Sequence, residues 1–140
     1  MKEIADTGLL VALLFRNDPF HNWALEAFRG HAPFCTSFYT CEAMLAEAAS
    51  FCPDPVALLK LVIRGDVLID PDFSVAKEAV HLASLASKYA DRPMDLADAC
   101  LVRMSELRLN CRIWTVDRSD FVAYRRMGRK AILGEFPPNC

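Results

Sequence analysis

The stretch EIADTGLLVALLF, residues 3–15, decides the fold of this chain. It joins a short apolar run to a longer one, and a single aspartate, Asp6, stands between them. This pattern predicts a short strand at residues 2–5 that is followed at once by a buried helix at residues 7–16. Asp is a frequent helix N-cap, because its side chain accepts hydrogen bonds from the free N–H groups of the first turn. The plainest interpretation of Asp6 is therefore a helix cap.

The same alternation continues along the rest of the chain. Short apolar strands that alternate with helices indicate an α/β fold, with a parallel sheet covered on both faces. Ligands of such a sheet bind beyond the carboxyl ends of the strands, where the following helices begin. Further strands are expected at residues 33–39, 67–69, 112–115 and 131–133. Further helices are expected at residues 20–29, at 41–51 with Thr40 as N-cap, from Pro55 to a stop at Gly65, and at 73–89, 94–107 and 119–124.

Length and composition bound the class of protein. The chain has 140 residues, 54% hydrophobic and 24% charged, so a single domain over residues 1–140 is expected. The apolar run at residues 9–15 is too short to span a bilayer, and no signal-peptide pattern accompanies it. We therefore expect a cytoplasmic protein with no membrane partner. The six cysteines form no C-x-x-C pair, so free thiols are favoured over a zinc site.

The charge of the chain is uneven, although its net value is only −2. Because the net charge is slightly negative, the protein as a whole does not show the excess of basic residues that is typical of nucleic-acid-binding proteins. Between residues 103 and 130, however, eight basic residues stand against three acids. Two interpretations of this local excess remain open: a positive rim beside a binding site, or a solvated helix face with scattered arginines.

Four separate segments could bring an acid to the same edge of the predicted sheet. Asp6 ends the first strand, and Glu47 lies two turns into the helix after the second strand. Asp95 and Asp98 open a later helix three residues apart, and so share one face. Asp117 follows the fourth strand. Each acid alone could be a helix cap, a partner of the helix dipole or a solvated side chain.

Together these acids have a chemical consequence. Several carboxylates at one edge of a sheet would repel each other, and a divalent cation relieves that repulsion. Oxygen ligands without Cys or His favour Mg²⁺ or Mn²⁺. A cation that keeps open positions binds a phosphodiester oxygen and lowers the pKa of a bound water. The acids therefore suggest metal-assisted hydrolysis of phosphodiester bonds.

Four short motifs carry a resemblance to a known family. They are Asp6-Thr7-Gly8, Thr40 followed by Glu47, Asp98-Ala99, and Thr115-Val116-Asp117 with Asp120-Phe121. In this order and spacing they resemble the PIN domain, and more narrowly the VapC-type toxin ribonucleases and related PIN-like nucleases. The resemblance runs from Glu3 to about Tyr124. It implies a Rossmann-like three-layer α/β/α sandwich with a mostly parallel sheet and a Mg²⁺- or Mn²⁺-dependent endoribonuclease that cuts RNA, often as a homodimer and often neutralised by a small antitoxin.

The resemblance also implies roles for individual residues. The metal ligands and catalytic acids would be Asp6, Glu47, Asp98 and Asp117. The supporting residues would be Thr7, which orients Asp6, together with Thr40, Asp95 and Thr115. Two assignments stay open at this point. Glu42 also follows Thr40, although the family spacing favours Glu47. Asp95 competes with Asp98, although the interval to Asp117 favours Asp98.

Other functions fit the sequence less well. A non-catalytic PIN-like RNA-binding or scaffold protein is expected to have lost one of the acids, and a housekeeping PIN nuclease would have no antitoxin. An aspartic protease needs two Asp residues that share a proton. A phosphatase with Asp6 as nucleophile needs a Gly-rich phosphate loop, and the chain has only five glycines. The hypothesis carried forward is a ribonuclease, the toxin of a type II toxin–antitoxin pair.

Overall fold

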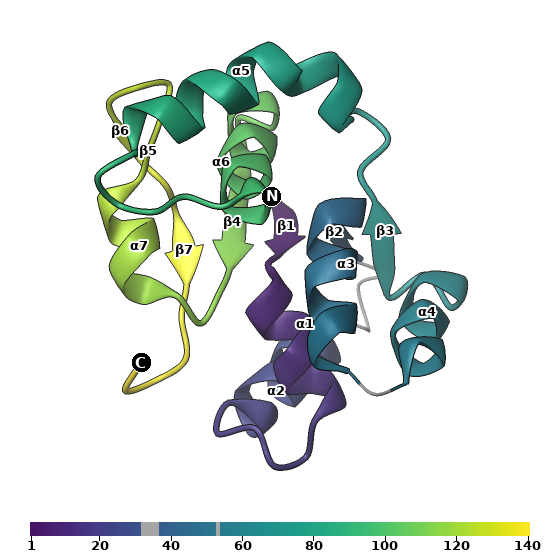
Figure 1. Cartoon of the computed structure of the whole chain (residues 1–140). Coiled ribbons are helices and arrows are strands. Elements are labelled where there is room, and N and C mark those ends of the chain that lie inside the picture. Colours follow the sequence, from purple (N-terminus) through teal and green to yellow (C-terminus); the bar gives the residue numbers. More distant parts are fainter. Residues whose placement is uncertain (32–36, 53) are drawn as a thin grey trace.

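The fold is that of a computed structural model, which describes residues 1–31, 37–52 and 54–140 (Figure 1). Its strands are β1 (Lys2–Ala5), β2 (Phe38–Thr40), β3 (Val67–Ile69), β4 (Cys111–Trp114), β5 (Arg125–Arg126), β6 (Lys130–Ala131) and β7 (Gly134–Glu135). Its helices are α1 (Thr7–Leu14), α2 (His21–His31), α3 (Glu42–Phe51), α4 (Pro55–Ile63), α5 (Val75–Lys88), α6 (Leu96–Leu107) and α7 (Arg118–Ala123).

Within the described residues, five strands form one parallel sheet in the order β3-β2-β1-β4-β7. The central strand is β1, where Ile4 lies opposite Tyr39 of β2 on one side and opposite Ile113 of β4 on the other. Parallel neighbours cannot be joined by a tight hairpin, so the chain crosses over between them, and most of these crossovers carry helices. The predicted α/β class with a parallel sheet is confirmed.

Hydrophobic side chains pack on both faces of this sheet. Neighbouring residues of a strand point to opposite faces, so Ile4 and Ala5 enter different cores. The core around Ile4 includes Leu101 of α6, and the core around Ala5 includes Leu9 of α1. Figure 1 shows α5 lying across α6, far from α1 and α2. The arrangement is compatible with helix, sheet and helix layers.

Most of the predicted elements are present, with ends shifted by one to three residues. The strands at residues 2–5 and 67–69 have the predicted bounds. Residues 33–36 of the second predicted strand lie outside the described residues, and β2 forms the end of that segment. α6 starts at Leu96 rather than Met94, because Asp95 caps it.

The prediction that Thr40 caps the third helix is wrong. Thr40 is the last residue of β2, and Cys41 stands at the cap without a side-chain hydrogen bond. The Thr40 carbonyl accepts the Asp70 N–H at 2.9 Å, which keeps this residue in the ladder with β3. Among the described residues, the buried Thr40 hydroxyl has no hydrogen-bond partner.

The last strand of the sheet also lies elsewhere than predicted. The edge strand is β7, whereas β6 pairs antiparallel with β5 and forms a separate ribbon. Met127 and Gly128 both have positive φ and reverse the chain between those two short strands. The ladder with β4 begins only where the Leu133 carbonyl accepts the Ile113 N–H at 2.9 Å. The apolar run at 131–133 is therefore split between the ribbon and the approach to β7.

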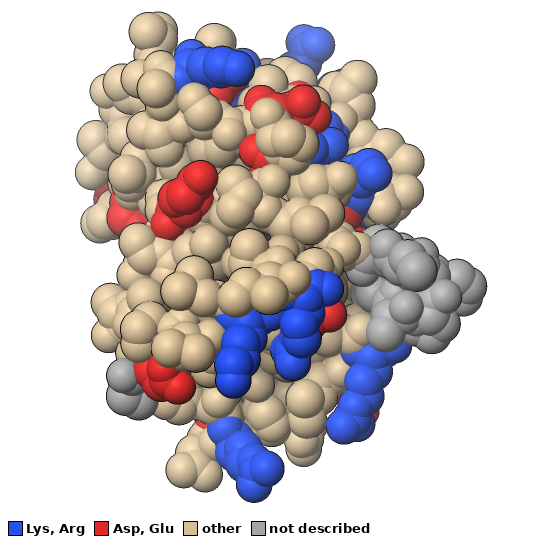
Figure 2. Space-filling view, turned by 90° about the vertical axis from the view of Figure 1, so that its right-hand side faces the viewer, with Lys and Arg blue, Asp and Glu red and all other residues tan. Residues whose placement is uncertain are grey.

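Several basic residues between 103 and 130 are engaged inside the fold. Arg103 pairs with Glu78 at 2.7 Å, and Arg112 pairs with Glu3 at 2.7 Å. Arg126 is 9% exposed and donates to backbone carbonyls. The local basic excess is thus partly a set of internal contacts. Figure 2 views the molecule from the α4 side and shows basic and acidic side chains interspersed between wide uncharged areas.

Three of the described cysteines lie in the core as free thiols. Cys41, Cys100 and Cys111 are buried free cysteines, and Cys35 lies outside the described residues. Among the helices described, none combines the length and apolar character that a bilayer crossing requires.

Candidate acidic site

Asp6 stands where β1 ends and α1 begins. Its Oδ1 accepts the Thr7 N–H at 2.7 Å, and its Oδ2 accepts the Thr115 hydroxyl at 2.6 Å. Its own N–H donates to the Trp114 carbonyl at 3.0 Å, so the ladder between β1 and β4 continues up to this residue. Asp6 is only 7% exposed. The predicted cap is confirmed, and the same carboxylate also links the ends of two neighbouring strands.

Gly8 allows α1 to begin close to the loop after β4. A Cβ atom at Gly8 would lie 2.4 Å from Cγ2 of Val116, which is closer than carbon atoms can approach. Each residue of the Asp6-Thr7-Gly8 motif therefore has its own task. Asp6 caps the helix, Thr7 reaches the neighbouring helix, and Gly8 leaves room for Val116.

Glu47 is connected to Asp6 through Thr7. The Thr7 hydroxyl lies 3.3 Å from Oε2 of Glu47 and 3.4 Å from the carbonyl oxygen of Met44, both on α3. Glu47 is half-buried, because α3 turns this face toward α1. Glu42, the competing glutamate, is exposed in the first turn of α3 and does not line the pocket described below.

Asp95 and Asp98 form a reciprocal capping box at the start of α6. The Asp98 N–H donates to Oδ1 of Asp95 at 2.8 Å, and the Asp95 N–H donates to Oδ2 of Asp98 at 3.3 Å. Of the roles open to Asp95, the structure shows that of the N-cap of α6. The box also fixes the Asp98 carboxylate at the first turn of α6.

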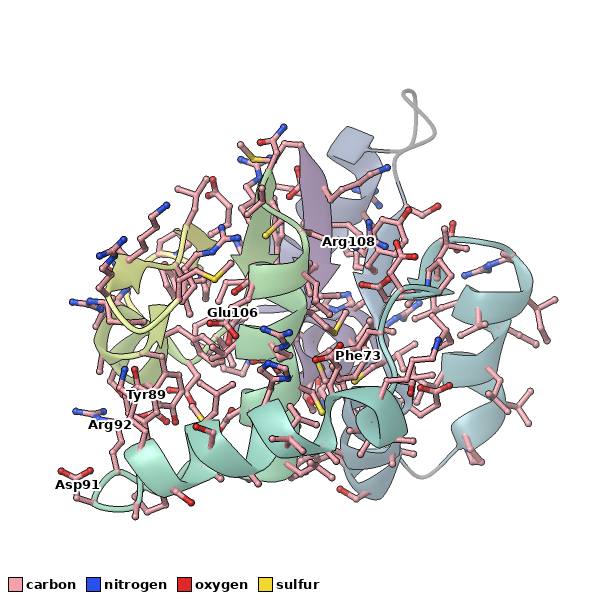
Figure 3. All side chains as sticks on the ribbon, turned by 90° about the horizontal axis from the view of Figure 1, so that it is seen from above. Phe73, Tyr89, Asp91, Arg92, Glu106 and Arg108 are labelled. Atoms are coloured by element: carbon pink, nitrogen blue, oxygen red, sulfur yellow. The ribbon has the colours of Figure 1, made fainter. Side chains whose placement is uncertain are left out.

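Asp117 caps α7 and leads to a second aspartate. The Asp117 N–H donates to the Thr115 hydroxyl at 3.0 Å, and its Oδ1 accepts the Asp120 N–H at 3.4 Å. Asp120 pairs with Arg92 at 2.8 Å. Figure 3 shows Arg92 close to Tyr89, in the loop that leads from α5 to α6. The Arg92–Asp120 contact joins two segments that are far apart in the chain, and no sequence pattern indicated it.

A pocket of about 550 Å³ brings these acids together. The acids that line it are Asp6, Asp18, Glu47, Asp95, Asp98, Asp117 and Asp120. Thr7 lines it too, whereas Thr40 and Thr115 do not. Of the described residues that line it, none is Lys or Arg, and Phe20 and Phe51 contribute apolar wall. The four predicted catalytic acids thus share one pocket. Asp18 was missed because it stands in a loop, where its carboxylate accepts the Phe20 N–H.

Burial and mutual repulsion raise the pKa values of these acids. Burial raises the pKa of Asp6 to about 6, against the opposing hydrogen bonds from Thr115 and Thr7. Burial, and then the charge of Asp95, raise the pKa of Asp98 to about 8. The same two causes raise the pKa of Glu47. The raised pKa values show that these crowded carboxylates disfavour one another's charged forms, and no Lys or Arg is among the described residues of the wall.

The donor chemistry of the pocket fits a hard divalent cation. Its acids present carboxylate oxygens, and the described lining residues include no thiol or imidazole, which is the donor set of Mg²⁺ and Mn²⁺. The acids are nevertheless spread out: in the part of the chain that is described, no three Asp, Glu, His or Cys side chains lie close enough to ligate one ion. Carboxylates of the right chemistry for a cation therefore line the same pocket, but they do not form a ligand cluster among the described residues of this structure.

No protein-family model matches the chain, and no curated protein matches it either. The fold and the pocket therefore carry the functional argument.

Proposed function

We propose that this chain is a Mg²⁺- or Mn²⁺-dependent endoribonuclease of the PIN-domain type. The observation that carries the proposal is the shared pocket of Asp6, Glu47, Asp98 and Asp117, beside the ends of β1 and β4. These acids come from four separate segments, in the order that the resemblance to PIN domains implies. A parallel sheet with its ligand site beyond the strand ends agrees with this proposal.

The residues of the pocket have distinct tasks in this proposal. A bound Mg²⁺ or Mn²⁺ supplies a Lewis acid and a water of lowered pKa. Asp6, Asp98 and Asp117 would hold the cation through carboxylate oxygens and Glu47 would complete the set, once these side chains draw together around the ion. Thr115 fixes the orientation of Asp6 through its hydrogen bond at 2.6 Å. Phe20 contributes apolar surface to the wall of the pocket.

The charge of the pocket makes the cation necessary for binding RNA as well as for cutting it. A phosphodiester that enters this pocket faces mostly carboxylates, because no Lys or Arg is among the described lining residues. A divalent cation reverses the sign of the local field. We therefore expect RNA to avoid this pocket when divalent cations are removed.

We also propose that the ribonuclease is the toxin of a type II toxin–antitoxin pair and forms a homodimer. The support is an apolar stripe on α4, made of Val56, Leu59 and Ile63, which are 53%, 51% and 80% exposed. Their spacing of three and four residues places them on one helix face. Exposed apolar stripes of this kind mark protein–protein contacts. α3 behind them belongs to the core, since its Met44 and Ala48 are buried.

The catalytic proposal is tested with purified protein and single-stranded RNA. Cleavage is expected with Mg²⁺ or Mn²⁺ and is expected to stop when EDTA is added. Absence of cleavage with both ions, by a protein whose circular dichroism shows a folded state, would overturn the proposal. The toxin proposal has its own test: a small DNA-binding protein encoded in the neighbouring reading frame should bind the chain and inhibit it. A nuclease that no neighbouring product inhibits would be a housekeeping enzyme.

One observation favours a second candidate, a non-catalytic RNA-binding or scaffold protein. In the described structure, Asp98 is engaged in its capping box, and the acids do not converge on a single point. Such a protein would bind RNA outside the acidic pocket. Its RNA affinity would be the same in EDTA and in Mn²⁺, and it would leave the RNA intact.

A further inference from the structure

A second cavity of about 590 Å³ lies beside the acidic pocket. The two share Pro19 and Phe20 in their walls, so they are neighbours along one groove. Trp23 of α2 lines only the second cavity, which we call the Trp23 pocket. Pro137 and Pro138, which follow the edge strand β7, form part of its wall.

The wall of the Trp23 pocket suits a flat, uncharged group. Trp23 and Phe20 offer aromatic surface, and the amides of Asn22 and Asn139 offer hydrogen-bond donors and acceptors. Glu26 is the single charged residue among the described residues that line it, so a phosphate finds no cation there. An aromatic ring with polar edges, such as a nucleobase, matches these surfaces.

Trp23 is held in place from behind. Its ring centroid lies 5.8 Å from that of Trp114, the last residue of β4, with the two rings tilted by 36°. Trp114 is 8% exposed and belongs to the core. Because its position is fixed before a ligand arrives, Trp23 would lose little side-chain freedom when it stacks on a base.

Arg118 is a cation that follows one residue of the acidic pocket and contacts the neighbour of a residue of the Trp23 pocket. Arg118 follows Asp117, which lines the acidic pocket, and its guanidinium lies 4.7 Å from the ring centroid of Phe136. Phe136 directly precedes Pro137 of the Trp23 pocket. An exposed guanidinium in this place suits a backbone phosphate between a base and the phosphodiester in the acidic pocket.

We propose that the Trp23 pocket binds one nucleobase of the RNA strand whose phosphodiester lies in the acidic pocket. The proposal rests on the proposed ribonuclease function and deepens it. The base is unstacked from its neighbours, stacks on Trp23, and presents its polar edge to Asn22 and Asn139. Cleavage therefore depends on the identity of one base at a fixed distance from the cut.

Tryptophan fluorescence tests base binding without any cleavage. Short single-stranded RNA oligonucleotides are titrated into the protein with Ca²⁺ in place of Mg²⁺ or Mn²⁺. The matched probes are a series of the same oligonucleotide, each of which lacks the base at a different single position. Saturable quenching that one particular abasic position abolishes is expected, and Trp23→Phe should remove most of the signal. Equal quenching by every abasic probe, or an unchanged signal in Trp23→Phe, would overturn the proposal.

Cleavage kinetics give an independent readout. Trp23→Leu keeps apolar bulk against Trp114, and it should raise KM about tenfold, the order expected for a lost stacking contact, with a much smaller change in kcat. Trp23→Phe should restore most of the affinity. Asn22→Ala should alter the base preference near the cut, whereas Asn110→Ala, an exposed asparagine before β4, should not. An unchanged cut-site preference in Asn22→Ala and Trp23→Leu would overturn the proposal.

The outcomes separate this proposal from the proposed function. If RNA quenches the fluorescence in a base-dependent way but is never cleaved, the base-binding role of the Trp23 pocket is supported and the ribonuclease function is rejected. If RNA is cleaved but causes no base-dependent quenching, the ribonuclease function is supported and base binding in the Trp23 pocket is rejected. If Trp23→Leu does not fold, the wild-type titration and the Asn22→Ala variant still decide the question.

Discussion

The Thr115 hydroxyl donates a hydrogen bond of 2.6 Å to Oδ2 of Asp6 and accepts one of 3.0 Å from the Asp117 N–H. One buried hydroxyl therefore connects two of the proposed metal ligands. It also explains how a carboxylate that is 7% exposed can remain at the end of β1, since both of its oxygens have partners. Thr115 is fully buried, so water cannot replace this contact.

Replacement of Thr115 by valine should impair the site more than the fold. Val has nearly the same shape but lacks the hydroxyl, so both hydrogen bonds are lost. We expect cleavage to fall about 10- to 100-fold, as for loss of other groups that orient a metal ligand, and the free energy of unfolding to fall by about 1–3 kcal/mol. Thr115→Ser should recover most of the activity. Kinetics of Thr115→Val equal to those of the wild type would show that Asp6 needs no such support.

Gly8 offers a steric test of the same region. Gly8→Ala places a Cβ atom 2.4 Å from Val116, so the free energy of unfolding should fall by about 1–3 kcal/mol. Val116→Ala in the same chain should restore part of that loss. Gly30→Ala in α2 is the matched control, because nothing lies within 4 Å of its Cβ position and the helix should gain about 0.5–1 kcal/mol. Denaturant unfolding measures all three. Equal effects of Gly8→Ala and Gly30→Ala would contradict the close approach of α1 to the Val116 loop.

The acids of the pocket should make the cation-free protein less stable as pH rises. The pKa of Asp98 is raised from 3.8 to about 8, so folding favours its protonated form. Its contribution is complete below about pH 4 and is lost as pH rises through about 8. Asp6 behaves in the same way up to about pH 6. Unfolding free energies in EDTA should therefore decline over this range, and Asp98→Asn should flatten the upper part. A stability that increases between pH 6 and 8 in EDTA would contradict this reasoning.

Arg92 should weaken cation binding through its contact with Asp120. Arg92→Gln removes one positive charge beside the pocket, so the dissociation constant of Mn²⁺ should fall several-fold, while stability changes by less than about 1 kcal/mol because the pair is partly exposed. Arg64→Gln is the matched control, since Arg64 pairs with Asp66 in the exposed segment after α4. Calorimetric titration with Mn²⁺ distinguishes the two variants. If both had the same Mn²⁺ affinity as the wild type, Asp120 would have no influence on the site.

Local patterns in the sequence were sufficient for much of this fold. Asp6 as a cap, the strand at residues 67–69 and Asp95 at the start of a helix all follow from short-range chemistry, and the structure confirms them. Thr40 was misjudged because its carbonyl pairs with Asp70 of a distant segment. The β5–β6 ribbon was missed because its turn depends on Met127, a residue that rarely adopts positive φ.

The candidate site shows the same division. The acids at strand ends and helix starts could be predicted, because a parallel sheet places such positions near one another. The family spacing favoured Glu47 over Glu42, and in the structure Glu47 lies beside Thr7 and lines the pocket, whereas Glu42 does not. Asp18 and Arg92 reach the site from loops, whose path no local pattern determines.

The most direct test of the central claim is metal-dependent cleavage of single-stranded RNA by wild type, Asp6→Asn and Asp91→Asn. Asp91 is an exposed aspartate close to Arg92 and outside the lining of the acidic pocket, so it controls for a general effect of removing a charge (Figure 3). We expect Asp91→Asn to cleave like the wild type with Mn²⁺, and Asp6→Asn to lose more than the roughly 100-fold typical of an outer partner of a metal ligand. Full Mn²⁺-dependent cleavage by a folded Asp6→Asn variant would contradict the claim that this pocket is the active site.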